Sequence, residues 1–197
     1  MTHLKDFLYL KLTEEEYREI LEYVNAILPM TWVKKYDSGE FPLSDEKMNP
    51  NTVGILGECA LGKYEGKPVT QILMERPVRE SDIGWDIVIG GYKYDIKTLQ
   101  SVIRPNTSYR YNIKKSMIDK KKANDGFIWI SMIPPLDRLI VPYYWLVMGW
   151  MFKDEFLQKS DFHRKGDNSV TGNDFVYSSD TYDIAVRKLH PYKDLPR

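Results

Sequence analysis

Residues 85–98 read WDIVIGGYKYDIKT, which predicts a β-hairpin that carries acids on strands otherwise suited to burial. Gly90 and Gly91 stand at or near the expected turn, as glycine does in short hairpins. A carboxylate on such a strand is costly unless it is paired or binds a metal. Asp95 and Lys97 are two residues apart and therefore share one face of a strand. Together with Asp86 they form a candidate site for a divalent metal ion and an attacking water.

The segments around this hairpin predict an α/β domain. Thr13 and Glu16 form a capping box that opens a helix, and Pro29 is expected to end it. A second helix is expected over about 52–64. Residues 127–133 are continuously apolar, which is typical of a buried central strand. We therefore expect a central mixed β-sheet flanked by helices.

The other expected elements rest on shorter patterns. They are strands at 69–74 and 139–148, a basic helix over 109–123, a short helix over 153–159, a polar irregular segment over 160–180, and a last strand or edge element at 183–189. We see no internal repeat and no linker long enough to argue for two domains, so residues 1–197 are expected to form a single domain.

The composition of the chain excludes some classes of protein. The chain has 197 residues, enough for one domain with a sizeable core. Its 28 basic and 28 acidic residues cancel, so nucleic-acid binding would need a local basic patch. The single cysteine, Cys59, excludes an intramolecular disulfide and fits a reducing compartment. No signal peptide or membrane span is visible, and we expect a cytoplasmic protein of a prokaryote or a virus-infected host cell.

Acid-X-lysine occurs at four places in the chain, so the tripeptide alone indicates little. The copies are 45–47, 65–67, 95–97 and 119–121. Only the copy at 95–97 lies in a predicted buried strand and follows a strand that carries an isolated acid. This context selects Asp95 and Lys97 as the candidate site.

The expected elements follow in the order of a helix with Glu58, a strand with Asp86, a strand with Asp95-Ile96-Lys97, a helix and a strand. This order resembles the core of the PD-(D/E)XK nuclease superfamily. That superfamily includes restriction enzymes, Holliday-junction resolvases, and repair and phage nucleases. The resemblance covers about residues 52–133. Trp85 stands where the motif has proline, and position 95 is aspartate, which the family permits. The resemblance implies a restriction-endonuclease-like fold and Mg²⁺- or Mn²⁺-dependent hydrolysis of DNA.

The resemblance also assigns roles that agree with the chemistry of these side chains. Asp86 and Asp95 would be metal ligands, joined by the Ile96 carbonyl and, directly or through water, by Glu58. Lys97 would orient or deprotonate the attacking water and offset charge in the transition state. The alternative is that the acids and the lysine form a structural salt bridge at a sheet edge, and that Glu58 is a solvated helix residue.

One basic concentration could contact DNA phosphates. Its proposed contact residues are Arg104, Arg110, Lys114, Lys115 and Lys121. The alternative is an ordinary solvated helix face. A homodimer is expected for cutting two strands, and the apolar region 139–150 could either join such an interface or fill the core. The alternative function is a catalytically silent nuclease-fold protein that binds nucleic acid or a protein partner; an unrelated α/β protein is a third possibility.

Overall fold

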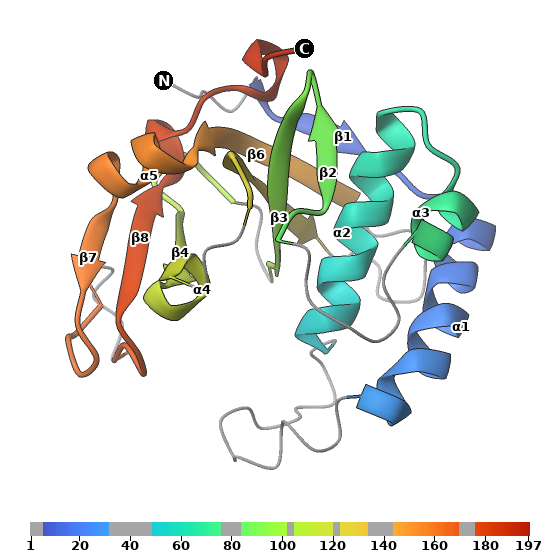
Figure 1. Ribbon diagram of the computed structural model, residues 1–197, viewed down its shortest axis with the longest axis horizontal. Coiled ribbons are helices and arrows are strands. Elements are labelled where there is room, and N and C mark those ends of the chain that lie inside the picture. Colours follow the sequence, from blue (N-terminus) through green and yellow to red (C-terminus); the bar gives the residue numbers. More distant parts are fainter. Residues whose placement is uncertain are drawn as a thin grey trace.

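The computed structural model describes residues 6–31, 49–75, 84–101, 105–119, 123–133, 144–169 and 176–197. These residues form an α/β architecture with a five-stranded mixed sheet at its centre. Helices cover one face of this main sheet, and a three-stranded sheet lies on its other side (Figure 1). The predicted fold class, a mixed sheet flanked by helices, is confirmed at this level.

The main sheet has the strand order β1-β6-β5-β3-β2. Its strands are β1 (Leu8–Leu10), β2 (Ile87–Ile89), β3 (Tyr92–Gln100), β5 (Gly126–Ile133) and β6 (Tyr144–Phe152). The neighbours β3 and β5 are parallel, and the other pairs are antiparallel. The predicted central strand is confirmed as β5, which is buried along almost its whole length because it has a neighbour on both sides.

Three helices pack on one face of the main sheet: α1 (Glu14–Thr31), α2 (Pro50–Tyr64) and α3 (Val69–Glu75). The capping box of α1 is confirmed, because the Glu16 amide donates to Thr13 Oγ1 at 3.2 Å and the Thr13 amide donates to Glu16 Oε2 at 2.6 Å. The helix continues to Thr31 and so passes Pro29, where we predicted its end. Proline removes one backbone hydrogen bond but has a φ that suits a helix, so a last turn can still include it.

The second sheet has the order β4-β8-β7 and is called the small sheet below. Its strands are β4 (Arg110–Lys114), β7 (Asp161–His163) and β8 (Thr181–Ala185). Around it lie α4 (Lys115–Asp119), α5 (Lys153–Lys159) and a single 3₁₀ turn, η2 (Val186–Lys188), whereas a second such turn, η3 (Tyr192–Asp194), lies against β6 of the main sheet. Tyr111 and Ile113 of β4 share a hydrophobic cluster with Phe127 and Trp129 of β5, which joins the two sheets.

Two predicted elements have the wrong type. Residues 69–74 form α3 instead of a strand, because Val69 and Leu73, one helical turn apart, are the residues that pack into the core. Residues 109–123 begin with strand β4 instead of a helix, because Tyr111 and Ile113 are buried and Asn112 between them is exposed. In both cases burial against neighbouring elements overrides the local sequence preference.

The C-terminal third departs from the prediction mainly in its boundaries. The strand expected at 139–148 is observed as β6, although residues 139–143 lie outside the described part of the chain. Its residues 145–151 are buried, so the described part of the apolar region 139–150 fills the core. The helix expected over 153–159 is confirmed. The segment expected to be irregular contains β7, and the last strand begins at Thr181.

None of the helices that the structure describes is long and apolar enough to cross a membrane.

Candidate active site

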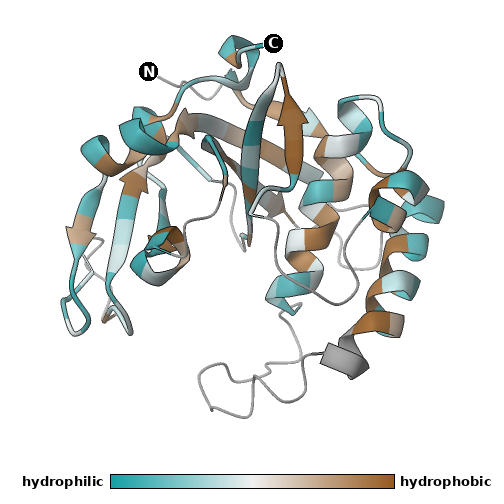
Figure 2. Ribbon diagram, viewed as in Figure 1, coloured by the Kyte–Doolittle hydropathy of each residue, from teal (hydrophilic) through white to brown (hydrophobic). Residues whose placement is uncertain are grey.

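The predicted hairpin is confirmed as β2 and β3. Ile87 pairs with Tyr94 and Ile89 with Tyr92, which leaves Gly90 and Gly91 as the two-residue turn. Their φ angles are 57° and 83°, and a tight hairpin turn of this kind requires such positive values at both positions. Figure 2 shows that β2 is hydrophobic throughout, whereas β3 mixes hydrophobic and hydrophilic residues.

Asp86 lies immediately before β2 and completes its pairing with β3. Its amide donates to the Tyr94 carbonyl at 2.8 Å, and its carboxylate oxygen Oδ2 accepts a hydrogen bond from the Ile96 amide at 2.7 Å. The Asp86 side chain thus occupies the place where the next backbone carbonyl of β2 would lie. Because the N–H and C=O of one strand residue point to the same side, the Ile96 carbonyl faces the edge where this carboxylate lies.

Asp95 and Lys97 form an ion pair on β3, with Lys97 Nζ 2.7 Å from Asp95 Oδ1. The side chain of Asp95 is 6% exposed and that of Lys97 is 20% exposed, so the carboxylate is buried and the ammonium group reaches the surface. Asp86 binds the Ile96 amide through its side chain, and Asp95 is the residue that precedes Ile96 in the chain. The structure thus places Asp86 against the Ile96 amide and Asp95 against Lys97, and a metal ion shared by the two carboxylates stays a prediction.

Glu58 lies in the middle of α2, in the helix layer. The next residue toward the N-terminus, Gly57, touches Thr98 of β3. Thr98 shares its strand face with Ile96, which packs in the helix-side cluster, so Asp95 and Lys97 point to the opposite face. Glu58 thus comes from the other side of β3, and its predicted role as a ligand stays a prediction.

The donor atoms of this site suit a hard divalent cation. Two carboxylates and a backbone carbonyl are oxygen ligands of the kind that Mg²⁺ and Mn²⁺ accept, and Mg²⁺ commonly binds through one or two carboxylates with water in its other positions. Among the described residues, no group of three or more His, Cys, Asp or Glu side chains is placed to hold a metal ion. The roles of Asp86 and Asp95 as metal ligands therefore stay a prediction.

A buried chain of hydroxyl groups lies on the Asp95 face of the main sheet. Ser101 Oγ is 3.2 Å from Ser131 Oγ, and Ser131 also bonds to the Tyr111 hydroxyl. Ser131 pairs in register with Leu99, two residues beyond Lys97. These bonds fix β4 of the small sheet against the strands of the site, and they join residues far apart in the sequence, which gave no local signal of them.

The basic residues predicted to bind DNA have different surroundings. Arg110 is 16% exposed, and its guanidinium is bound by Asp183 and Asp161. Lys115 pairs with Asp119 of its own helix, whereas Lys114 has no carboxylate partner among the described residues. Arg104 and Lys121 lie outside the described part of the chain. Of the three described members of this group, Lys114 is thus the cation without a carboxylate partner.

No family model, curated protein or solved structure matches this chain. Its function is therefore inferred from the site alone.

Proposed function

We propose that this protein is a Mg²⁺- or Mn²⁺-dependent nuclease that hydrolyses DNA phosphodiesters, with a core of the restriction-endonuclease type. The observation that carries the proposal is a pair of contacts on the β2–β3 hairpin: the Asp86 carboxylate accepts from the Ile96 amide at 2.7 Å, and Lys97 Nζ lies 2.7 Å from Asp95 Oδ1. The parallel pairing of β3 with β5 supports it, and so does the element order, which is the predicted helix, strand, strand, helix and strand with α3 and β4 added.

Asp86, Asp95 and the Ile96 carbonyl would hold the ion, and Glu58 would join them directly or through water. The bound ion would supply charge neutralisation at the phosphate and a more acidic water. Lys97 would orient the attacking water or accept its proton, and its positive charge would stabilise the developing negative charge. Asp95 holds the Lys97 ammonium group in place through their ion pair, which limits the positions of Nζ.

The proposal is tested by a cleavage assay on linear, nicked, single-stranded and four-way-junction DNA with Mg²⁺ or Mn²⁺. We expect the wild type to cut, chelation to stop it, and Asp95→Ala and Lys97→Ala each to lower the rate about 10²- to 10⁴-fold. The preferred substrate would separate a restriction-type enzyme from a junction resolvase or a repair nuclease.

The matched control is the exposed ion pair of Lys67 and Glu75, in which Lys67 Nζ lies 3.1 Å from Glu75 Oε2. Glu75 is the last residue of α3, which belongs to the helix layer. Lys67→Ala and Glu75→Ala also remove one charge from an acid–lysine pair, and we expect full activity from both. An equal loss of activity in the control and site variants would contradict the proposal, because it would point to a general effect of charge removal.

A second candidate is a catalytically silent protein of the same fold that binds nucleic acid or a protein partner. The pairing within the site favours it, because Asp86 already accepts from the Ile96 amide and Asp95 already pairs with Lys97. Absence of cleavage on every substrate, with DNA binding that needs no metal and is unchanged in Asp95→Ala, would favour this candidate over the nuclease.

A further inference from the structure

Carboxylates already neutralise most lysines and arginines of the described residues. Examples are Lys63 with Glu16 and Lys188 with Asp161. Lys11 and Lys93 lie over the rings of Tyr144 and Trp85 instead. Within the described ranges, the cationic side chains with neither an ion pair nor another polar or ring contact are Lys114, Arg164, Lys165 and Arg187. These cations can bind an anion without first giving up a partner.

Lys114, Arg164 and Lys165 come together at one end of the small sheet. Lys114 is the last residue of β4 and pairs with Thr181, which pairs with His163, the last residue of β7. Arg164 follows His163 directly, and the Lys165 amide donates to Asp180 Oδ1 at 3.0 Å. We call Lys114, Arg164 and Lys165 the basic end. Arg187 follows β8 and therefore lies at the opposite end of the small sheet.

The turn after β7 is held firmly, and its aspartates bind backbone groups. Asp167 Oδ2 accepts from the Arg164 amide at 2.7 Å, and the Gly166 amide donates to the Tyr177 carbonyl at 2.8 Å. Gly166 has a φ of 95°, which suits glycine. Asp167 and Asp180 accept from backbone amides, and neither forms a described ion pair with the side chain of Arg164 or Lys165. Both cations are exposed.

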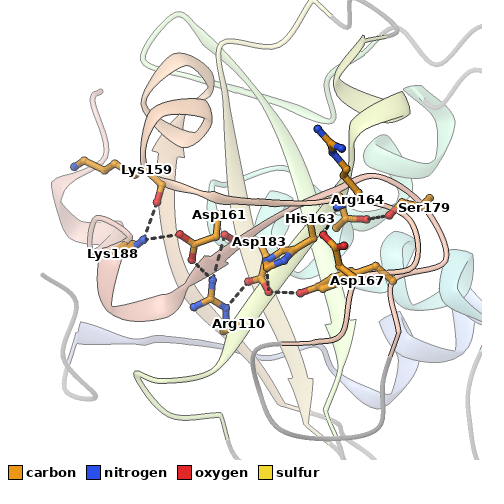
Figure 3. Close-up of polar contacts among 11 residues, drawn as sticks. Arg110, Lys159, Asp161, His163, Arg164, Asp167, Ser179, Asp183 and Lys188 are labelled. Carbon is orange, nitrogen blue, oxygen red and sulfur yellow. Dashed lines mark hydrogen bonds and ion pairs between the residues drawn. The ribbon is translucent and has the colours of Figure 1, made fainter.

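A buried network of side chains, centred on Asp183, lies next to this turn. Asp183 accepts from Arg110 Nε and from the Tyr177 hydroxyl, each at 2.6 Å, and the ring of His163 stacks on Tyr177 with centroids 4.5 Å apart. Burial and the bond to Asp183 raise the pKa of Tyr177 to about 12, so the hydroxyl stays a donor. Figure 3 shows the Arg164 side chain pointing away from the Arg110–Asp161–Asp183 network. The basic end thus stands on a rigid support.

We propose that the basic end binds the phosphate backbone of a nucleic acid, a proposal that rests on the proposed nuclease function because it names the surface that holds the substrate. Among the described residues these three cations have no partner, and lysine and arginine side chains of this kind bind phosphate oxygens independently of sequence. The basic end points in the same direction as the C-terminal end of β3, the strand that carries Asp95 and Lys97 (Figure 1). Two of its residues come from the segment that the sequence marked only as polar.

The test measures DNA binding by Asp95→Asn protein, so that cleavage does not interfere, over salt concentrations of about 50 to 200 mM. The probe is a fluorescently labelled DNA duplex of random sequence. We expect the triple change Lys114→Ala, Arg164→Ala and Lys165→Ala to weaken binding at low salt at least about tenfold. We also expect it to reduce the slope of log K against log salt by about 0.9 for each phosphate that the variant no longer neutralises.

Arg187→Ala is the matched control, because it removes an exposed cation that has no partner among the described residues and lies at the opposite end of the small sheet. We expect it to leave the affinity and the salt slope unchanged. Melting temperatures of all variants, measured by circular dichroism, show whether the fold is intact. Equal slopes for the triple variant and the wild type would overturn the proposal, and so would an equal loss of affinity in Arg187→Ala.

The outcome for this surface is separate from the outcome for the nuclease. If the wild type cuts DNA but the triple variant binds with an unchanged slope, the surface proposal fails and the nuclease stands. If nothing cuts DNA and the triple change still abolishes salt-dependent binding, the surface stands and the nuclease proposal fails. If the wild type binds no DNA at low salt, the basic end is not a nucleic-acid surface, and a protein partner becomes the better hypothesis.

Discussion

Gly57 sets how closely α2 approaches the strand that carries Asp95 and Lys97. A Cβ atom built on Gly57 would lie 2.0 Å from Thr98 Oγ1 and 2.8 Å from Thr98 Cγ2. Real atoms do not approach so closely, so any larger residue at this position must push the helix away from β3. The residue next to Gly57 is Glu58, so this contact also fixes the backbone position of the predicted third ligand.

We expect Gly57→Ala to lower the free energy of unfolding by about 1–3 kcal/mol, because a methyl group inserted at this contact overpacks it. This loss exceeds the gain of up to about 1 kcal/mol from replacing glycine within a helix. Gly54→Ala is the control, since the atom nearest to its new Cβ would be Glu58 Oε1 at 4.0 Å. We expect that variant to be neutral or stabilised. Urea denaturation checks both, and equal stability of the two variants would contradict the close contact.

At the scale of single elements, Arg110 joins all three strands of the small sheet. It lies on β4, its Nε donates to Asp183 of β8 at 2.6 Å, and its guanidinium also binds Asp161 of β7. The hydrogen bond from Arg110 holds the pKa of Asp161 below its ordinary value. Asp183 is 5% exposed, so its charge depends on this arginine for compensation.

We expect Arg110→Ala to lower the free energy of unfolding by about 3–5 kcal/mol at neutral pH, because it leaves the Asp183 carboxylate buried without its cation. Lys114→Ala removes a charge from the same strand but breaks no described ion pair, and we expect a change within about 0.5 kcal/mol. Chemical denaturation of both variants measures the difference. A similar small effect in both variants would show that the ion pairs of Arg110 with Asp161 and Asp183 add little stability. Arg110 could then leave them for a DNA phosphate, as its predicted role requires.

The sequence predicted those parts of the fold whose signals are local. The pattern at 85–98 predicts the hairpin and the placement of Asp95 and Lys97 on one face of a strand, because turn chemistry and strand alternation act within a few residues. It could not predict that Arg110 binds Asp161 and Asp183, which lie 51 and 73 residues away in the chain. The helix at 69–75 was missed because the packing of Ile72 beside Gly62 of α2, a tertiary contact, decides its structure.

At the scale of the whole molecule, residues 190–197 brace the hairpin from outside. The Trp150 indole donates to the Pro191 carbonyl at 3.0 Å, which anchors this segment to β6. Glu65, just after α2, accepts from the Tyr192 hydroxyl at 2.7 Å and from the Arg197 guanidinium at 3.1 Å. A Cβ built on Gly90 would lie 2.5 Å from the Pro196 carbonyl, so the segment touches the hairpin turn. Glu65 thus holds α2, this segment and the hairpin together.

We expect Glu65→Ala to increase amide hydrogen exchange in residues 192–197 and also in the turn at Gly90 and Gly91. The first increase follows because the hydrogen bonds to Tyr192 and Arg197 are removed, and the second because the backbone of Pro196 no longer supports the turn. Hydrogen exchange read by mass spectrometry measures both regions. Glu75→Ala is the control, because it breaks an exposed ion pair with Lys67 that touches neither region.

Faster exchange in 192–197 with no change at the turn would show that the hairpin turn is stable without its contact to residues 192–197. Faster exchange in both would mean that the contact of Glu65, at the C-terminal end of α2, stabilises the strands next to Asp86 and Asp95. The measurement needs no substrate or metal, so it tests the support of the site independently of the proposed reaction. A rigid hairpin is what any chemistry at this site requires, because small displacements of reacting groups lower rates steeply.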